Sequence, residues 1–386
     1  MITKDAGTMK RRSFLTKSLM SAAWLAMPEV VLAAASTTSP TASGSLKDAG
    51  AKCGIKVGLQ SGRQTLQIPE FAQIVTDNFN MLTPGNELKW PRLRPGPDTF
   101  DFADPDWMVN FCEANGILVH GHNLCWNSPM SSPSWFKNTL DKSNASHYLT
   151  EHITTVMRHY QGRIDSWDVV NEPTVFWSKR SDGLYPGIWL DLLGPTYIDT
   201  AFHAAAAADP KALLVLNVYD VEHGTPDHET TRKTTIALLK QLLARGVPIQ
   251  AVGMESHLDA SLPPGGVGLS AFIEQVRDMG LQMLITEMDI NDTHTEGDFQ
   301  TRDEIVAKTY RDYLTQVVPI SGAKRVIFWT PTDKWDWLNS TNIPHGERAD
   351  KTPHRPGLFD DTMGPKLAFG AVRSALGEIC ASETRR

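Results

Sequence analysis

The chain has 386 residues, which is long enough for one large domain or two ordinary ones. A formal net charge of −7 and the lack of an extended basic block exclude a nucleic acid as the expected partner. The 11 tryptophans favour a neutral partner, because flat indole rings stack on the C–H faces of sugars as well as filling cores.

The N-terminal residues have the composition of an export signal. Arg11 and Arg12 precede Phe14-Leu15 and an apolar stretch over residues 19–27, which is too short to span a bilayer. We expect residues 1–35 to be a signal peptide of the twin-arginine type, removed on export to the periplasm or extracellular space and leaving no membrane span. A retained anchor is the alternative. Residues 36–46, rich in Ser, Thr and Ala, are predicted to be a flexible lead-in.

Eight short apolar runs follow, each ending in polar or charged residues and each followed by a helical pattern. They cover residues 56–59, 80–83, 117–123, 166–171, 213–218, 251–257, 282–289 and 325–329. Continuous apolar runs are typical of strands buried on both faces, and the amphipathic stretches between them supply an outer layer of helices. This order predicts an α/β fold, a (β/α)8 TIM barrel in a single domain over residues 47–380, with a polar tail at 381–386. An open doubly wound sheet is the alternative, but no GxGxxG motif follows the first run.

The four cysteines are Cys53, Cys112, Cys125 and Cys380. They form no CxxC pair and have no His at metal-ligand spacing, so we predict no metal site and no cofactor. We interpret them as buried free thiols. A bridge between Cys53 and Cys380 is the alternative, since a closed barrel brings the two ends of its chain together.

Two of the apolar runs lead to a glutamate. Catalytic residues of such barrels stand at the C-terminal ends of the strands, and the fourth and seventh runs reach Glu172 and Glu287 there. Glycoside hydrolysis needs two carboxyl groups, one protonated to assist the leaving oxygen and one ionised to attack, about 5–5.5 Å apart in retaining enzymes. We expect Asn171 to bind a sugar 2-hydroxyl, and His257, held from behind by Asp289, to orient Glu287.

Six segments in order resemble glycoside hydrolase family 10, the endo-β-1,4-xylanases, over nearly all of residues 50–376. They are GHNLCW (121–126), WDVVNEP (167–173), GMESHL (253–258), ITEMDI (285–290), FWTPTDKWDWL (328–338) and LFDDTMGPKLAF (358–369). The resemblance implies an enzyme that hydrolyses internal β-1,4-xylosidic bonds with retention, through a covalent glycosyl-enzyme intermediate. Its partner would be a polysaccharide, xylan or a related β-linked glycan, and we expect a monomer.

Carried over residue by residue, the resemblance assigns Glu172 as the acid/base and Glu287 as the nucleophile. It implies that Lys89 reaches the hydroxyls of the sugar at the cleavage point, that Trp337 covers this sugar, and that Tyr219 lies on the leaving-group side. The full set of implied substrate-binding residues is Asn86, Lys89, His122, Trp126, Asn171, Tyr219, Glu255, His257, Trp329 and Trp337.

Three positions depart from the family pattern. Gly85 stands where the family has a Glu, Asn127-Ser128-Pro129 stands where it has His-Ser-Gln, and Glu255 stands where it has a Gln. Because the missing Glu and Gln help to grip the second sugar on the glycone side, we expect that subsite to be weakened or reshaped. We expect Glu255 to be protonated beside Glu287 in the working enzyme, and the wild type to have an acid-shifted pH optimum relative to Glu255→Gln.

Three other functions remain open. The first is a different β-glycosidase activity on the same scaffold, acting on another or a decorated polysaccharide. The second is a non-catalytic carbohydrate-binding barrel, which the presence of both glutamates disfavours. The third is a metal-dependent hydrolase, whose cluster of Asp220, Glu222, His223 and Asp227-His228 we interpret as a solvated loop.

Overall fold

The computed structural model describes residues 44–329, 332–340 and 347–385. The chain divides into two units, residues 1–42 and 43–386, and all described residues belong to the second. The predicted signal peptide and most of the predicted lead-in therefore lie outside the described residues. Ser45 begins helix α1 (Leu46–Ala51) by accepting a hydrogen bond from the N–H of Asp48 at 3.1 Å, which satisfies one of the free donors of the first turn.

Eight parallel strands in the described part of the chain form a closed ring. Their order is β6-β5-β4-β3-β2-β1-β9-β8, β8 pairs with β6 to close the ring, and the short β7 pairs with the end of β8. The strands are β1 (Lys56–Ser61), β2 (Met81–Pro84), β3 (Leu118–Gly121), β4 (Ser166–Asn171), β5 (Leu213–Val218), β6 (Ala251–Met254), β7 (His257–Asp259), β8 (Gln282–Asn291) and β9 (Arg325–Phe328). The predicted (β/α)8 barrel is confirmed.

The sixth predicted run differs from the structure, because it contains two strands. β6 ends at Met254, and Ser256 adopts a φ of 65°, which turns the chain before β7 begins at His257. A buried carboxylate fixes this turn, since Glu222 Oε1 accepts from the N–H of Ser256 at 2.9 Å. The Ser256 hydroxyl lies 2.8 Å from the hydroxyl of Tyr313 on α12. Glu222 and Tyr313, which are both distant in the sequence, therefore hold the turn between β6 and β7.

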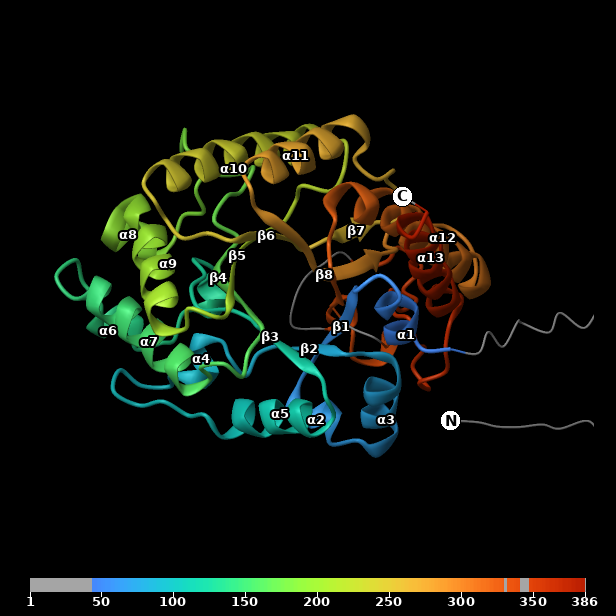
Figure 1. The fold of residues 1–386 in the computed structure, drawn as a ribbon, viewed down its shortest axis with the longest axis horizontal. Helices are drawn as coiled ribbons and strands as arrows, with labels where there is room; N and C mark the ends of the chain where they lie inside the picture. Colours follow the sequence, from blue (N-terminus) through green and yellow to red (C-terminus); the bar gives the residue numbers. More distant parts are fainter. Residues whose placement is uncertain (1–43, 330–331, 341–346, 386) are drawn as a thin grey trace, which may run out of the picture. The chain divides into compact units, whose positions relative to one another are not determined.

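Helices lie outside the ring of strands (Figure 1). Typical local signals set their ends: Asp298 caps the start of α12 by accepting from the N–H of Thr301, and Gly322, with a φ of 66°, caps its end. No helix among the described residues is both long and apolar enough to cross a membrane. Beyond α1, the helices are α2 (Arg63–Leu66), α3 (Pro69–Asn78), α4 (Trp90–Leu93), α5 (Ala103–Ala114), η1 (Pro129–Ser131), α6 (Phe136–Thr139), α7 (Ala145–His159), α8 (Ile188–Leu193), η2 (Gly194–Thr196), α9 (Tyr197–Ala208), α10 (Pro226–Ala244), α11 (Gly266–Asp278), α12 (Phe299–Ser321), η3 (Asp333–Trp335), η4 (Trp337–Asn339) and α13 (Leu367–Glu383).

The core follows from the apolar runs. Every residue of β2, β4 and β6 is buried, so the strands have no solvent-facing side. A small cluster of Val215, Ala251 and Leu284 lies apart from the main core, which the strands share with the helices. The apolar interior therefore supports the barrel from both sides and leaves polar residues to the strand ends.

A disulfide bond joins Cys53 and Cys380, with 5.0 Å between their Cα atoms. Our interpretation of this pair as free thiols was therefore wrong, whereas Cys112 and Cys125 are free and buried. Cys380 lies on α13, which extends to Glu383 and into the segment expected to be a polar tail. Contact between α1 and α13 brings the two cysteines together, and this contact depends on the closed ring rather than on any local motif.

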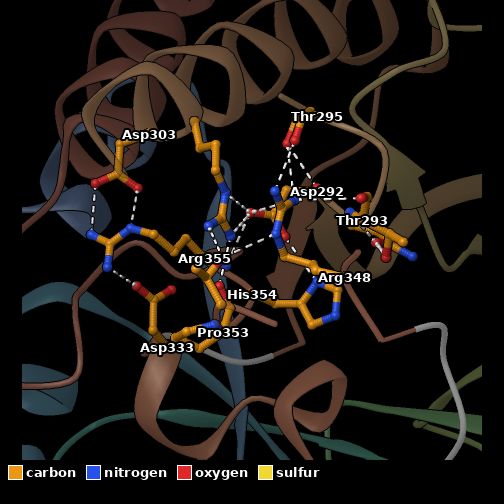
Figure 2. Close-up of polar contacts among 12 residues, drawn as sticks. Asp292, Thr293, Thr295, Asp303, Asp333, Arg348, Pro353, His354 and Arg355 are labelled. Atoms are coloured by element: carbon orange, nitrogen blue, oxygen red, sulfur yellow. Dashed lines mark hydrogen bonds and ion pairs between the residues drawn. The ribbon is translucent and has the colours of Figure 1, made fainter. Parts of the chain in front are cut away.

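The segment after β9 is fastened to the barrel by a buried ionic network (Figure 2). Its centre is Asp292, directly after β8, whose fully buried carboxylate accepts from Arg302 Nε at 2.9 Å and lies 2.9 Å from His354 Nδ1. Arg348 donates to the backbone oxygen of Asp292 and to that of Thr295, the latter at 2.9 Å. The network ties residues 348–354 to α12 and to the end of β8, the strand that carries Glu287.

Candidate active site

One cleft of about 530 Å³ contains the site residues that were predicted from the sequence. Both glutamates and all the expected substrate-binding residues line it, and they follow the C-terminal ends of the strands as the barrel rule requires. These lining residues are Asn86, Lys89, His122, Trp126, Asn171, Glu172, Tyr219, Glu255, His257, Glu287, Trp329 and Trp337. Asp289 lies directly behind them.

Glu172 is the first residue after β4 and has the chemistry of an acid. Its φ of 47° is unusual for a residue with a side chain, and its N–H donates to the backbone oxygen of Asn217 at 2.8 Å. Burial, with the nearby charge of Glu287 next in importance, raises the pKa of Glu172 to about 8. The carboxyl group can therefore hold a proton at neutral pH, as a general acid must.

Glu287 lies within β8 and is 4% exposed. Its Oε1 accepts a hydrogen bond from Asn217 Nδ2 at 2.8 Å and lies 3.6 Å from His122 Nδ1, while its Oε2 lies 3.6 Å from His257 Nε2. Asn217 thus donates a hydrogen bond to one oxygen of the carboxylate, and an imidazole ring lies close to each oxygen. This arrangement orients an ionised carboxylate and stabilises its charge.

Asn217, at the inner end of β5, connects the site residues. Its Nδ2 lies 2.8 Å from Asn171 Oδ1, 2.8 Å from Glu287 Oε1 and 3.2 Å from Glu255 Oε1. The Thr286 hydroxyl donates to its Oδ1 at 2.7 Å and sets the orientation of the amide. Because an amide NH₂ has two hydrogens, it serves two of these three acceptors, and the longest contact is the one to Glu255.

Glu255 is 2% exposed and lies beside two other carboxyl groups. Burial raises the pKa of Glu255 well above its ordinary value, and the charges of Glu287 and Glu172 raise it further. Its Oε2 lies 3.7 Å from His257 Nε2. A protonated Glu255 needs no hydrogen bond from Asn217. This agrees with the geometry of Asn217, whose two amide hydrogens serve the two nearer acceptors.

His257 is held from behind, as the sequence predicted. Its Nδ1 lies 2.7 Å from Asp289 Oδ1, and the other oxygen of Asp289 accepts from Trp337 Nε1. Burial alone would lower the pKa of His257, but the charge and hydrogen bond of Asp289 raise it well above the ordinary value. One buried carboxylate therefore fixes the imidazole and the indole that face the cleft.

His122 has an equivalent support on the opposite side of Glu287. Its Nδ1 lies 2.9 Å from Asp168 Oδ2, and His120 Nε2 lies 3.0 Å from the same oxygen. Burial alone would raise the pKa of Asp168, but the two histidines lower it to about 2. Asp168 therefore stays ionised. It was not among the predicted site residues, although it lies within a predicted strand.

Lys89 provides a cation between two indole rings. Its Nζ lies 5.6 Å from the ring centre of Trp126 and 5.8 Å from that of Trp329, and donates to Asn86 Oδ1 at 3.4 Å. Burial lowers the pKa of Lys89, and the charges of Glu287 and Glu172 oppose that change. The side chain is thus directed at the place where the two glutamates converge.

Tyr185 and Tyr219 line the cleft, and Trp177, which is not a lining residue, contacts both of them. Trp177 Nε1 donates to the Tyr219 hydroxyl at 3.2 Å, and its ring centre lies 5.0 Å from that of Tyr185. Trp177 is 46% exposed, which leaves a large apolar face open to a ligand. The sequence identified Tyr219 but not Tyr185 or Trp177, since no strand end or spacing marks them.

Asn127, which stands where the family pattern has a His, forms hydrogen bonds with the backbone of a neighbouring loop. Asn127 is 3% exposed, its Nδ2 donates to the backbone oxygen of Tyr185 at 3.2 Å, and its Oδ1 accepts from the N–H of Trp189 at 3.0 Å. The side chain therefore supports the loop that follows β4. It is absent from the cleft lining, whereas the neighbouring Ser128 is present.

The loop after β5 is not solvated as expected. Glu222 is 1% and His223 3% exposed, because Glu222 accepts from the backbone N–H groups of Val221 and Ser256 at 2.8 and 2.9 Å. The interpretation of these two residues was wrong, since their partners come from a distant part of the chain. Asp220 adopts a φ of 53° and follows the cleft residue Tyr219.

Two groups of side chains in the described residues have donor atoms close enough to hold a metal ion. One is His122, Asp168 and Glu287, and the other is Glu255, His257 and Glu287. Both share Glu287 and consist of the side chains that already contact one another around it. These contacts account for the arrangement of both groups through hydrogen bonds and ion pairs.

Further cleft residues were missed by the sequence analysis. Asn217 contacts the lining residues without being one of them, and as the last residue but one of β5 it could have been identified by the rule of polar strand ends. Gln60 lies near the end of β1 and has the same signal. The remaining additional lining residues come from loops, where no periodicity marks them: Ser128, Met130, Tyr185, Trp335, Asp336 and Ser340.

Comparisons with known proteins agree with this geometry. The family model of glycosyl hydrolase family 10 matches residues 45–375. The chain is 32% identical to a β-1,4-xylanase of Dictyoglomus thermophilum over 316 residues, covering 80% of this chain and 85% of that protein. It is 29% identical to endo-1,4-β-xylanase B of Thermotoga neapolitana over 337 residues, covering 85% of this chain and 90% of that protein.

Solved structures give the same result. Native xylanase 10B from Thermotoga maritima superposes with a TM-score of 0.76 at 28% identity, covering 88% of this chain and 100% of that one. Xylanase 10B from Thermotoga petrophila RKU-1, in complex with xylobiose, gives a TM-score of 0.77 at 28% identity, with 88% and 98% covered. The resemblance noted from the motifs is thereby confirmed: the chain belongs to glycosyl hydrolase family 10 and is a glycoside hydrolase.

Proposed function

We propose that the protein is a retaining endo-β-1,4-xylanase that cleaves internal bonds of xylan by double displacement. The observation that carries this proposal is the contrast between two glutamates that line one cleft. The pKa of Glu172 is raised to about 8 by burial and by Glu287, whereas Glu287 accepts a hydrogen bond from Asn217 and lies between the imidazole rings of His122 and His257. Such a pair, one acid and one ionised base, is what glycosidase chemistry requires.

In the first step, Glu172 gives its proton to the glycosidic oxygen while Glu287 attacks the anomeric carbon. The C–O bond to the leaving sugar breaks, and an ester bond to Glu287 forms. Asn171, whose Oδ1 accepts from Asn217, keeps its Nδ2 3.3 Å from Glu172 Oε1 and is available to the 2-hydroxyl of the reacting sugar. Positive charge develops at the anomeric carbon in the transition state, and the carboxylate of Glu287 stabilises it as the new bond forms.

In the second step, the ionised Glu172 takes a proton from water, and the resulting hydroxide attacks the anomeric carbon. The ester bond to Glu287 breaks, and both carboxyl groups return to their starting states with retention of configuration. Loss of the Glu172 proton and its return both follow from the same environment, because the charge of Glu287 is neutralised while the ester exists. The raised pKa of Glu172 is expected to fall in that intermediate.

The reducing-sugar assay on xylan tests this proposal. Release is expected from the wild type and is expected to fall by about 10²–10⁴-fold in Glu172→Ala, with a similar or larger loss in Glu287→Ala. Proton NMR of the first product should show the β-anomer before mutarotation. Appearance of the α-anomer would refute the retaining mechanism, and full activity in either variant would refute the residue assignment.

A second candidate is a retaining β-glycosidase of the same fold that acts on a different or decorated polysaccharide. Gly85 and the loop contacts of Asn127 favour it, because neither position supplies the side chain that the family pattern has. A panel of defined linear and branched oligosaccharides distinguishes the two. Faster hydrolysis of a branched or non-xylose oligosaccharide than of linear xylo-oligosaccharides would select the second candidate.

We further propose that the enzyme is exported in folded form through the twin-arginine route and acts as a monomer outside the cytoplasm. The paired Arg11 and Arg12 support the route. Replacement of both by Lys should retain the protein in the cytoplasm, which cell fractionation measures. Light scattering of the purified enzyme tests the monomer.

A further inference from the structure

Gln60 of β1 occupies space beside Gly85, the residue that follows β2. A Cβ atom added to Gly85 would lie 1.6 Å from Gln60 Nε2 and 2.7 Å from its Cδ. The two strands are paired in register, with Gln60 opposite Thr83, and the N–H of Gly85 donates to the backbone oxygen of Ser61 at 3.0 Å. The main chain of the barrel therefore fixes the positions of the two residues, and the Gln60 side chain fills the space beside Gly85.

Space, and not backbone conformation, excludes a side chain at Gly85. The φ of Gly85 does not lie in the left-handed region, so an L-residue can adopt this backbone. The obstacle is the amide end of one flexible side chain, which can move away. Any residue larger than glycine at position 85 would thus displace the amide of Gln60 without needing to distort the barrel.

The amide of Gln60 faces the cleft. Gln60 and Gly85 both line it together with Asn86 and Lys89. No residue in the described ranges forms a hydrogen bond with the Gln60 amide, whose donor and acceptor groups are available to a ligand. Asn86 and Lys89 mark this part of the cleft as the glycone side under the proposed function.

We propose that Gln60 determines specificity at the second sugar on the glycone side, where its neutral amide takes the place that a side chain at position 85 would otherwise fill. This role rests on the proposed function. The amide can donate to one sugar hydroxyl and accept from another, as Asn86 beside it can. The subsite is therefore rebuilt from β1 and recognises a neutral hydroxylated sugar, rather than being left empty by the glycine.

Two aryl glycosides measure this subsite. p-Nitrophenyl β-xyloside places one sugar on the glycone side and p-nitrophenyl β-xylobioside places two, so the ratio of their kcat/KM values reports the second sugar. Gln60→Ala is expected to lower this ratio by about 2- to 10-fold, the loss of one or two neutral hydrogen bonds. Gln64→Ala is the matched control, since Gln64 lines a neighbouring cavity and is absent from the cleft lining.

A double-mutant cycle tests the displacement. Gly85→Ala should lower the ratio as much as Gln60→Ala does, and the double variant should show no further loss, because both changes remove the same amide from the site. An unchanged ratio in Gln60→Ala, or losses that multiply in the double variant, would overturn the role of Gln60. A wild type that hydrolyses neither glycoside nor xylan would instead refute the proposed function, and the role of Gln60 with it.

Discussion

Replacing Asp292 by Asn removes the negative charge at the centre of the buried network behind β8 (Figure 2). The side chain keeps its size, so the change tests charge and not packing. Arg302, which is fully buried, would retain only neutral acceptors, namely Thr352 Oγ1 at 2.8 Å and the backbone oxygen of Pro353 at 2.6 Å. His354 would lose the carboxylate 2.9 Å from its Nδ1.

The expected magnitude follows from this uncompensated charge. Removing one partner of a buried ion pair costs about 3–5 kcal/mol. A domain of roughly 340 residues unfolds with an entropy of about 0.7 kcal/mol/K near its Tm. The Tm of Asp292→Asn should therefore fall by about 4–7 °C.

Differential scanning calorimetry measures this change, with Asp312→Asn as the matched control. Asp312 pairs with Lys308 along α12, but their side chains are 46% and 76% exposed, so the control should shift the Tm by less than about 1 °C. Equal Tm values for the two variants would refute the reasoning. The xylan assay at 25 °C should show a raised KM in Asp292→Asn, because His354 is hydrogen-bonded to Asn339 of η4, the helix that carries Trp337.

Three further predictions concern pH and the disulfide. The kcat/KM of the wild type should fall as pH rises through about 8, because Glu172 must be protonated to act and burial and Glu287 raise its pKa to that value; a rate that stays constant to high pH would contradict this. Glu255→Gln should keep its activity to a higher pH than the wild type, since the wild-type carboxyl eventually ionises beside Glu287 and the amide cannot; superimposable pH profiles would count against it. Opening the Cys53–Cys380 bridge with a reductant should lower the Tm, because such bridges stabilise proteins by about 2–5 kcal/mol, and calorimetry with and without the reductant would show no difference if the bridge were absent.

Those parts of the fold that depend on local patterns were predictable. Apolar runs identified the strands because a barrel strand is buried on both faces. Glu172 and Glu287 were found because catalytic groups stand where those runs end. Asn171 and His257 followed by the same argument, and the structure places each of them in the cleft.

Features that depend on contacts between distant segments were not predictable. The break after β6 requires Glu222 and Tyr313 to reach Ser256 from other elements. The buried state of Glu222 has the same cause, since a sequence of charged residues looks solvated until its partners are known. The disulfide required α1 and α13 to pack together, and spacing between Cys53 and Cys380 carries no information about that.

Closure of the ring also affects an incomplete chain. β1 acquires its second neighbour only when β9 has been made, and the bridge between residues 327 positions apart lies near the same join. A polypeptide that stops before Arg325 would leave β1 and β8 with unpaired edges, which are sites for association with other chains. The oxidised state of the two terminal cysteines therefore distinguishes a completed molecule from an aggregation-prone fragment.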